Sequence, residues 1–460
     1  MNNDRSTSNT RDTTEPPPSA WLHRLCLALA VATFPLIFMG GLVTTHGMGM
    51  SVPDWPNSYG YNMFLFPASA WVDGIFFEHT HRLLGTVVGF IAILVLLHAW
   101  GPARSPVARR RIGFVAVGLL ILTLASAAVL AAYHPPAFFK WFQHVVVGFA
   151  SFALIAAGAW SARVREPRAW VRWLSVVTFL AVCIQGTLGG LRVTMVNLDL
   201  AIVHACFAQA FLCLAGAMCV VTSRWWSDVA RGQREKAGEL VGDFNPQSPV
   251  SSLRYSIDPT RRRLFALAVL CVVTIYAQLI VGALMRHYRA GLAIHDLPLA
   301  FGKILPPISQ AGIDLANRDR AWLTVQENAH WSKRLEPVTL TKVWLHFGHR
   351  TGAVVVSILL IMLIMQTLRS KGLDISLRRP AALLIPFLTI QVTLGLLTVY
   401  YRKPAEVASL HVAVGALLLL TTFVLCVRAG RVYSLLTERP VVSPVPASRG
   451  PVSPTVASIS

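Results

Sequence analysis

Ionisable side chains stand at the start of two long apolar runs in this sequence. They are Glu78, His79, His81 and Arg82 before the run 83–100, and His346, His349 and Arg350 before the run 351–365. Ionisable groups at the edge of a membrane span are costly and mark candidate sites. A His-Arg pair that enters an apolar run twice predicts an internal duplication built around histidine sites.

The composition is that of a membrane protein. Of the 460 residues, 54% are hydrophobic and 13% are charged, whereas soluble domains have about 25% charged residues. The net charge of +20 comes from basic residues spread between the apolar runs. This distribution is typical of positive-inside topology and argues against nucleic-acid binding. All seven cysteines fall inside apolar runs, so we expect buried thiols and no disulfide framework.

The expected fold is an all-α polytopic membrane protein. It has two tandem, pseudo-symmetric four-helix bundles and an extra helical hairpin in the first half. Ten runs are long enough to cross about 30 Å of hydrocarbon. They lie at about 21–45, 79–100, 110–133, 138–162, 171–193, 200–223, 263–285, 344–368, 379–400 and 408–428. Basic connections alternate with connections almost free of Lys and Arg, which predicts that both termini are cytoplasmic and that 46–78 lies outside.

The expected domains follow from these runs. They are a disordered tail (1–20), an N-terminal bundle (21–223, extra hairpin at about 109–162), a cytoplasmic linker (224–262), a C-terminal bundle (263–430, outer loop 286–342) and a second disordered tail (431–460). The two bundles align by short motifs, which pair 41–46 with 282–287, 49–60 with 291–302, 81–82 with 349–350 and 185–189 with 391–395. The interval 81–185 is 62 residues longer than 349–391, which fits one unmatched hairpin.

In each half, two helices that run inward carry one histidine each at the same depth. The expected pairs are His81 with His204 and His349 with His411. Facing histidines in a four-helix bundle can bind a haem iron from both sides. His144 is an alternative to His204, and any single histidine in a span can also be a packing residue.

The neighbouring ionisable residues have expected roles at these sites. We expect His79 and His346 to contact the ligand histidines or haem propionates, and Arg82 and Arg350 to pair with propionates. Packing is the alternative for the histidines and snorkelling for the arginines. Glu78 has no carboxylate counterpart in the second half, where His346 stands. A carboxylate beside one site only predicts chemistry there and electron transfer at the other; the alternative is a simple interfacial Glu.

These residues resemble the haem A synthase family over about residues 21–430, apart from the extra hairpin. The resemblance rests on the four aligned histidines and on Gly-Gly-Leu-Val (40–43), Pro-Asp-Trp-Pro (53–56), Glu-His-Thr-His-Arg (78–82) and Gln-Gly-Thr-Leu-Gly-Gly-Leu-Arg-Val (185–193). It implies oxidation of the C8 methyl of haem O to the formyl of haem A, in an inner (cytoplasmic) membrane, for cytochrome oxidase biogenesis. It also implies that His81 and His204 hold the substrate haem O with Glu78 catalytic, and that His349 and His411 hold a haem b cofactor.

The implied partners are haem O, membrane lipid, a haem O synthase, an electron donor of the ferredoxin or quinol type and a second copy of the chain. The sequence departs from the family in two respects. Eight spans are usual in the family, against the ten expected here, and the cysteine pair that many members carry around the Asp-Trp-Pro turn is replaced by Val52 or Pro53 and by Ser58. The rival interpretation is a non-catalytic bis-histidine membrane cytochrome that transfers electrons from quinol. The presence of Glu78 in one half only favours the enzyme.

Overall fold

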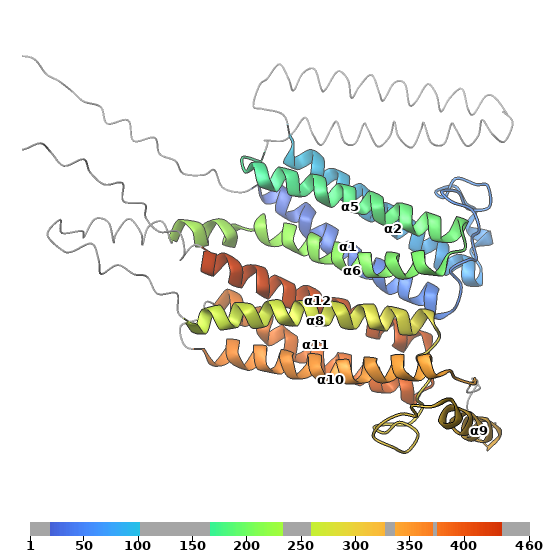
Figure 1. Ribbon diagram of the computed structural model, residues 1–460. Coiled ribbons are helices and arrows are strands. Elements are labelled where there is room, and N and C mark those ends of the chain that lie inside the picture. Colours follow the sequence, from blue (N-terminus) through green and yellow to red (C-terminus); the bar gives the residue numbers. More distant parts are fainter. Residues whose placement is uncertain (1–18, 102–165, 233–258, 327–335, 371–374, 435–460) are drawn as a thin grey trace, which may run out of the picture.

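The computed structural model describes residues 19–101, 166–232, 259–326, 336–370 and 375–434 (Figure 1). These residues form nine α-helices, one short 3-10 helix and no β-strand, and eight of the helices are long and apolar enough to cross a membrane. The prediction of an all-α polytopic membrane protein is therefore confirmed. The expected spans 110–133 and 138–162 and His144 lie outside the described residues.

The helices are α1 (Ala20–Thr45), α2 (Asp73–Ala99), α5 (Ala169–Thr194), α6 (Leu198–Val221), α8 (Pro259–His287), α9 (Gln310–Gln326), α10 (Leu340–Arg369), α11 (Ile375–Tyr400) and α12 (Ala405–Ser434), with the 3-10 helix η1 at Ala68–Ala70. At a rise of 1.5 Å per residue, a helix of the length of α1 extends for about 39 Å and exceeds the hydrocarbon thickness. Polar side chains cap several starts: Ser19 accepts from Leu22 N, and Asn197 accepts from Asp199 N and Leu200 N.

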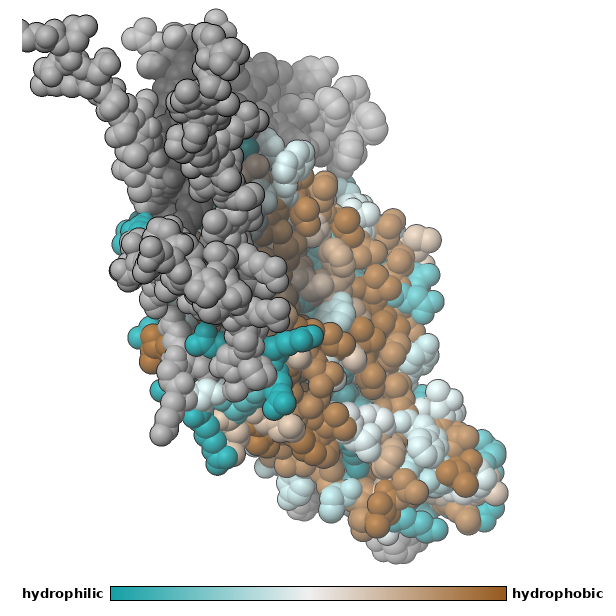
Figure 2. Space-filling model, turned by 60° about the vertical axis from the view of Figure 1, so that its left-hand side comes forward, coloured by the Kyte–Doolittle hydropathy of each residue, from teal (hydrophilic) through white to brown (hydrophobic). Residues whose placement is uncertain are grey.

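The spanning helices form two bundles of four. In the first, α1, α2, α5 and α6 pack as a ring in which α2 and α6 are diagonal, and in the second α8, α10, α11 and α12 pack in the same order. Figure 1 shows the blue-to-green bundle beside the yellow-to-red one, with their helix axes roughly aligned. The bundles meet where α12 packs on α1 and α6, and where α6 packs on α8. Apolar side chains cover much of the outer surface of the helices, as lipid contact requires (Figure 2).

Two features differ from the sequence-based expectation. Helix α2 begins at Asp73, six residues before the expected start at 79, so Glu78 and His79 lie inside a helix rather than at its mouth. The loop 286–342 contains helix α9, which hydropathy did not predict because α9 is not apolar. Ile313 of α9 belongs to the buried cluster that includes Ile294, and Ala316 is also buried.

Candidate functional site

The four expected histidines come together as two pairs, one inside each bundle. The ring centroids of His81 in α2 and His204 in α6 are 6.5 Å apart, and those of His349 in α10 and His411 in α12 are 6.4 Å apart. In both bundles the pair comes from diagonally opposed helices, so the rings face each other across the centre of the bundle.

The spacing of both pairs fits an iron bound between two imidazoles. Imidazole nitrogens bind transition metals at about 2 Å, so two rings on opposite sides of one haem iron have centroids roughly 6 Å apart. Both pairs agree with this value without movement of the helices. The donor set, two neutral imidazoles, is also one that haem iron accepts.

Each of the four rings lies against a glycine of a neighbouring helix. An added Cβ would lie 2.9 to 3.1 Å from Cε1 of the imidazole in all four cases, which are Gly40 with His81, Gly189 with His204, Gly282 with His349 and Gly395 with His411. Cβ atoms are rarely found so close to a side chain, so a methyl group would displace the ring. The glycines therefore set the position of every ring.

Glutamine residues orient three of the rings. Nδ1 of His204 donates to the backbone carbonyl of Gln185 at 3.2 Å, and Nδ1 of His411 donates to that of Gln391 at 3.1 Å. A proton on Nδ1 leaves the lone pair on Nε2 for a metal. His349 instead has Nδ1 3.0 Å from the side-chain amide of Gln278. Gln278 was not among the residues predicted from the sequence.

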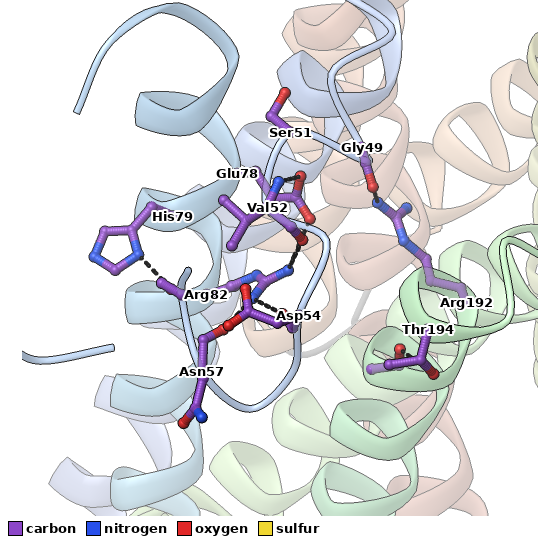
Figure 3. A network of polar contacts seen from close by, with 12 residues as sticks. Gly49, Ser51, Val52, Asp54, Asn57, Glu78, His79, Arg82, Arg192 and Thr194 are labelled. Carbon is purple, nitrogen blue, oxygen red and sulfur yellow. Dashed lines mark hydrogen bonds and ion pairs between the residues drawn. The ribbon is translucent and has the colours of Figure 1, made fainter. Parts of the chain in front are cut away.

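Glu78 and Arg82 hold the loop that follows α1 (Figure 3). The two oxygens of the buried Glu78 carboxylate accept from Val52 N and from Nη2 of Arg82, each at 3.0 Å. Arg82 also donates to the carbonyls of Asp54, Asn57 and Val52. An ion pair in which both carboxylate oxygens and both terminal guanidinium nitrogens are hydrogen-bonded avoids the cost of an unpaired buried charge.

The second half repeats this anchor with a histidine in place of the carboxylate. Nδ1 of the buried His346 accepts from Ile294 N at 3.1 Å, and its Nε2 lies 3.3 Å from Nε of Arg350. Arg350 donates to three loop carbonyls, those of Asp296, Leu299 and Ile294. Arg82, Arg350 and His346 are thus engaged with the loops, and their expected contact with haem propionates stays a prediction.

The aspartates of both loops cap equivalent turns. Asp54 accepts from Tyr59 N and Gly60 N, and Asp296 accepts from Phe301 N and Gly302 N. The glycines at these turns have φ of 76° and 72°, a conformation that favours glycine over other residues. The internal duplication therefore extends to the hydrogen bonds of the loops.

His79 points away from the histidine pair. Its Nδ1 lies 3.1 Å from Oγ of Ser58, and its ring packs against Phe66 and Trp71. Ser58, which stands where many family members have a cysteine, therefore contributes to the core of the loop. None of these contacts involves His81 or His204. The expected contact of His79 with a ligand histidine or a haem propionate stays a prediction.

The register of the duplication differs by one residue from the sequence alignment of 41–46 with 282–287. The turn after α1 is closed by Met48 N donating to the Val43 carbonyl, and the turn after α8 by Ala290 N donating to the Met285 carbonyl. This register pairs Gly40, and not Gly41, with Gly282. The alignment was wrong here because the Gly-Gly pair offers two equally good matches.

Comparison with known proteins assigns the chain to a family. The chain matches the model of the family described as cytochrome oxidase assembly protein over residues 126–424, more than half of its length. A heme A synthase of Symbiobacterium thermophilum is 31% identical over 184 residues, 40% of this chain and 54% of the relative. A heme A synthase of Chelativorans sp. (strain BNC1) is 31% identical over 164 residues, 36% of this chain and 39% of the relative.

A heme A synthase of Rickettsia prowazekii is 26% identical over 169 residues, 36% of this chain and 43% of the relative. The chain thus spans about half, or less, of the length of these curated relatives. The family match, in contrast, covers the larger part of the chain, including α5, α6 and most of the second bundle. This protein therefore belongs to the cytochrome oxidase assembly protein family.

Proposed function

We propose that the protein is a haem A synthase, an oxidoreductase that converts the C8 methyl of haem O to the formyl of haem A. The observation that carries the proposal is the facing histidine pair in each bundle, at the separation that two axial ligands of one iron require. Membership of the family, and the names of the relatives, support the same reaction.

The two pairs have different tasks in this proposal. His81 and His204 bind the substrate haem O, and His349 and His411 bind a haem b cofactor that supplies electron transfer. The chain itself contributes the Nε2 lone pairs and the carbonyls that fix the tautomer of His204 and His411. It also contributes the four glycines that leave space for the histidine rings.

The cofactor assignment is tested at the second pair. Replacing His411 by Ala removes one axial ligand, so we expect the low-spin spectrum of the bound haem b to disappear or to become high-spin. Optical and electron paramagnetic resonance spectra of the purified protein measure this change. His295→Ala, in the outer loop, is the matched control. An unchanged low-spin spectrum in both His411→Ala and His349→Ala would contradict the assignment.

Glu78 is the proposed catalytic residue because it is the feature that the second half lacks. His346 performs the same loop anchoring without a carboxylate, so anchoring alone does not explain Glu78. A carboxylate one helical turn from His81 adds a negative charge and a proton acceptor beside the first site. These properties suit general-base catalysis or stabilisation of positive charge that develops at the methyl carbon.

The test exploits the duplication, because Glu78→His introduces the anchor that the second half already uses. We expect Glu78→His and Glu78→Gln to give folded protein that binds haem O and accumulates little haem A. The readout is the haem composition of membranes, extracted and separated by chromatography. Normal haem A yield from Glu78→His would remove the catalytic role, and loss of bound haem from both variants would show that the anchor itself is essential.

The rival function, a membrane cytochrome that transfers electrons from quinol, is favoured by one observation: Glu78 and His346 occupy equivalent anchors. The proposed enzyme lies in the inner membrane with both termini cytoplasmic, receives haem O from a haem O synthase and takes electrons from a ferredoxin or quinol. Haem A that forms only when the chain is present separates the enzyme from the cytochrome.

A further inference from the structure

The loop between α1 and α2 turns back along α2 instead of ending above it. Oγ1 of Thr86 donates to Sδ of Met63 at 3.3 Å, and Arg82, one turn earlier in α2, donates to three carbonyls of the same loop. Thr86 is the fourth residue of the apolar run 83–100. The residues around Met63, called the first tip (62–65), therefore lie beside the apolar part of the helix.

The length of α2 indicates how deep this contact lies. The helix has 27 residues and extends for about 40 Å, whereas the hydrocarbon layer is about 30 Å thick. Its apolar run continues to its last residue, Ala99, so the excess of about 10 Å falls at its start, in the turns before about residue 80. Thr86 then lies inside the hydrocarbon layer, and the first tip reaches the edge of this layer.

Apolar side chains of the first tip are exposed at this depth. Phe64 is 57% exposed and Leu65 is 60% exposed. Val87, which follows Thr86 in α2, is also exposed, and apolar side chains cover much of the outer surface of the helices (Figure 2). The first tip therefore extends the lipid-facing surface of α2.

The backbone of the first tip suits contact with lipid, where a backbone N–H must find its acceptor within the protein. Phe64 N donates to Oδ1 of Asn62 at 2.9 Å, and Leu65 N donates to the carbonyl of Asn62 at 2.9 Å. Both exposed side chains of the tip thus belong to residues whose backbone donors are paired.

The second half has an equivalent tip in the loop between α8 and α9. An isolated β-bridge precedes each tip, Ser58–Tyr61 in the first loop and Ala300–Lys303 in the second. The second bridge is followed by three exposed aliphatic side chains, those of Ile304 (82%), Leu305 (61%) and Ile308 (78%). We call residues 304–308 the second tip. The internal duplication therefore produces an exposed apolar tip twice.

The second tip meets the demand on the backbone in another way and is tied to the start of α10. Pro306 and Pro307 have no N–H that could be left unpaired. Nε1 of Trp344, in the second turn of α10, donates to the Pro307 carbonyl at 3.2 Å, and tryptophan is typical of the membrane–water interface. Figure 1 shows the two loops at the same end of the molecule and at opposite edges of the paired bundles, where lipid surrounds the protein.

We infer that both tips insert into the lipid leaflet on their side of the membrane. Exposed apolar patches mark contacts with proteins or with membranes. Lipid is favoured here because the first tip lies beside an apolar span with its backbone donors paired, and because the second carries two prolines and is held by an interfacial tryptophan. The inference rests on the membrane-spanning helices and not on the proposed function, so its failure would leave that function untouched.

The test measures the surroundings of a spin label at each tip of the full-length protein in vesicles of phosphatidylcholine and phosphatidylglycerol. The exposed Cys183 is first replaced by Ser, and the spectrum of this variant is subtracted as background. Leu65→Cys and Ile304→Cys then carry the label at the two tips. Electron paramagnetic resonance measures the collision of the label with oxygen, which concentrates in lipid, and with a water-soluble nickel chelate.

At both tips we expect oxygen to relax the label more strongly than the nickel chelate does. Asp314→Cys is the matched control, because Asp314 is exposed on the polar helix α9 on the same side of the membrane. At this position we expect the chelate to dominate. Phe64→Cys and Ile308→Cys repeat the measurement if a first variant does not fold.

Stronger relaxation by the nickel chelate at both tips, as in the control, would overturn the inference and leave the tips as a surface for a partner protein. Broadening of the spectra by neighbouring labels, lost on dilution with unlabelled protein, would also overturn it, because a second copy of the chain would then cover the tips.

Discussion

Each histidine is positioned by a helix other than its own. Glycine supplies the space in all four cases and glutamine the hydrogen bond in three, and both stand on the neighbouring helix. A ligand held in this way keeps its orientation only as long as the two helices stay packed. Binding geometry and bundle stability are therefore coupled at single residues.

The four glycines that lie against the histidine rings allow a prediction at the scale of single residues. In Gly282→Ala the added methyl would lie 3.1 Å from Cε1 of His349, so the ring must move by a few tenths of an ångström, and the proposed bond to haem iron would weaken. We expect a partial change of the second haem from low-spin to high-spin in optical spectra. In the control Gly348→Ala no described atom lies within 4 Å of the new methyl. Identical spectra for both variants would contradict the role of Gly282 in positioning His349.

The four histidines could be predicted from the sequence because they recur at matched positions in two apolar patterns. Gln278 was missed because the first half has no glutamine at the equivalent position, so alignment of the two halves does not mark it. The Gln-x-x-x-Gly spacing, which occurs three times, is the signal that could have found it. The bonds of Arg82 and Arg350 could not be predicted, because their acceptors are backbone carbonyls that only the folded loops bring together.

At the scale of elements, hydropathy predicted each described span to within six residues at either end, and the largest deviations are at the start of α2 and the end of α12. Hydropathy reports burial in lipid, whereas the first turns of α2 are stabilised by contacts with the loop 46–72. Glu78 and the histidines after it interrupt the apolar pattern, so hydropathy does not extend the span back to Asp73. The duplicated anchors explain why both loop-to-helix junctions, before α2 and before α10, carry ionisable residues.

Helix α9 is a second element that hydropathy could not predict. It is held by Arg320, which donates to the carbonyls of Leu292, Ala293 and Glu336, and by Asn317, which exchanges two hydrogen bonds with Val338. Burial lowers the pKa of Arg320 to about 10, so the guanidinium stays charged at neutral pH. A polar helix anchored by a buried arginine has no counterpart in a hydropathy profile.

At the scale of the molecule, the two histidine pairs are joined by the helices that carry one histidine of each pair. His204 is on α6 and His411 is on α12, and these helices pack directly on each other. Ile37, Leu212 and Ala416 are buried at this junction. The interface therefore sets the separation of the two histidine pairs, on which electron transfer between bound haems would depend.

Close packing at Gly216 yields the last prediction. An added Cβ at this position of α6 would lie 2.4 Å from Cδ1 of Leu420 in α12, so Leu420 inserts where glycine leaves space. Small residues permit such close approach of membrane helices, and overpacking typically costs about 1–3 kcal/mol.

Gly216→Leu should force the bundles apart, which lowers the Tm of the full chain in detergent and reduces the haem A yield. Each pair lies within one bundle, so the low-spin spectrum should persist. Gly348→Leu, on an exposed face of α10, is the control for a leucine added to a spanning helix. An equal Tm for the two variants would show that the bundles do not depend on this contact.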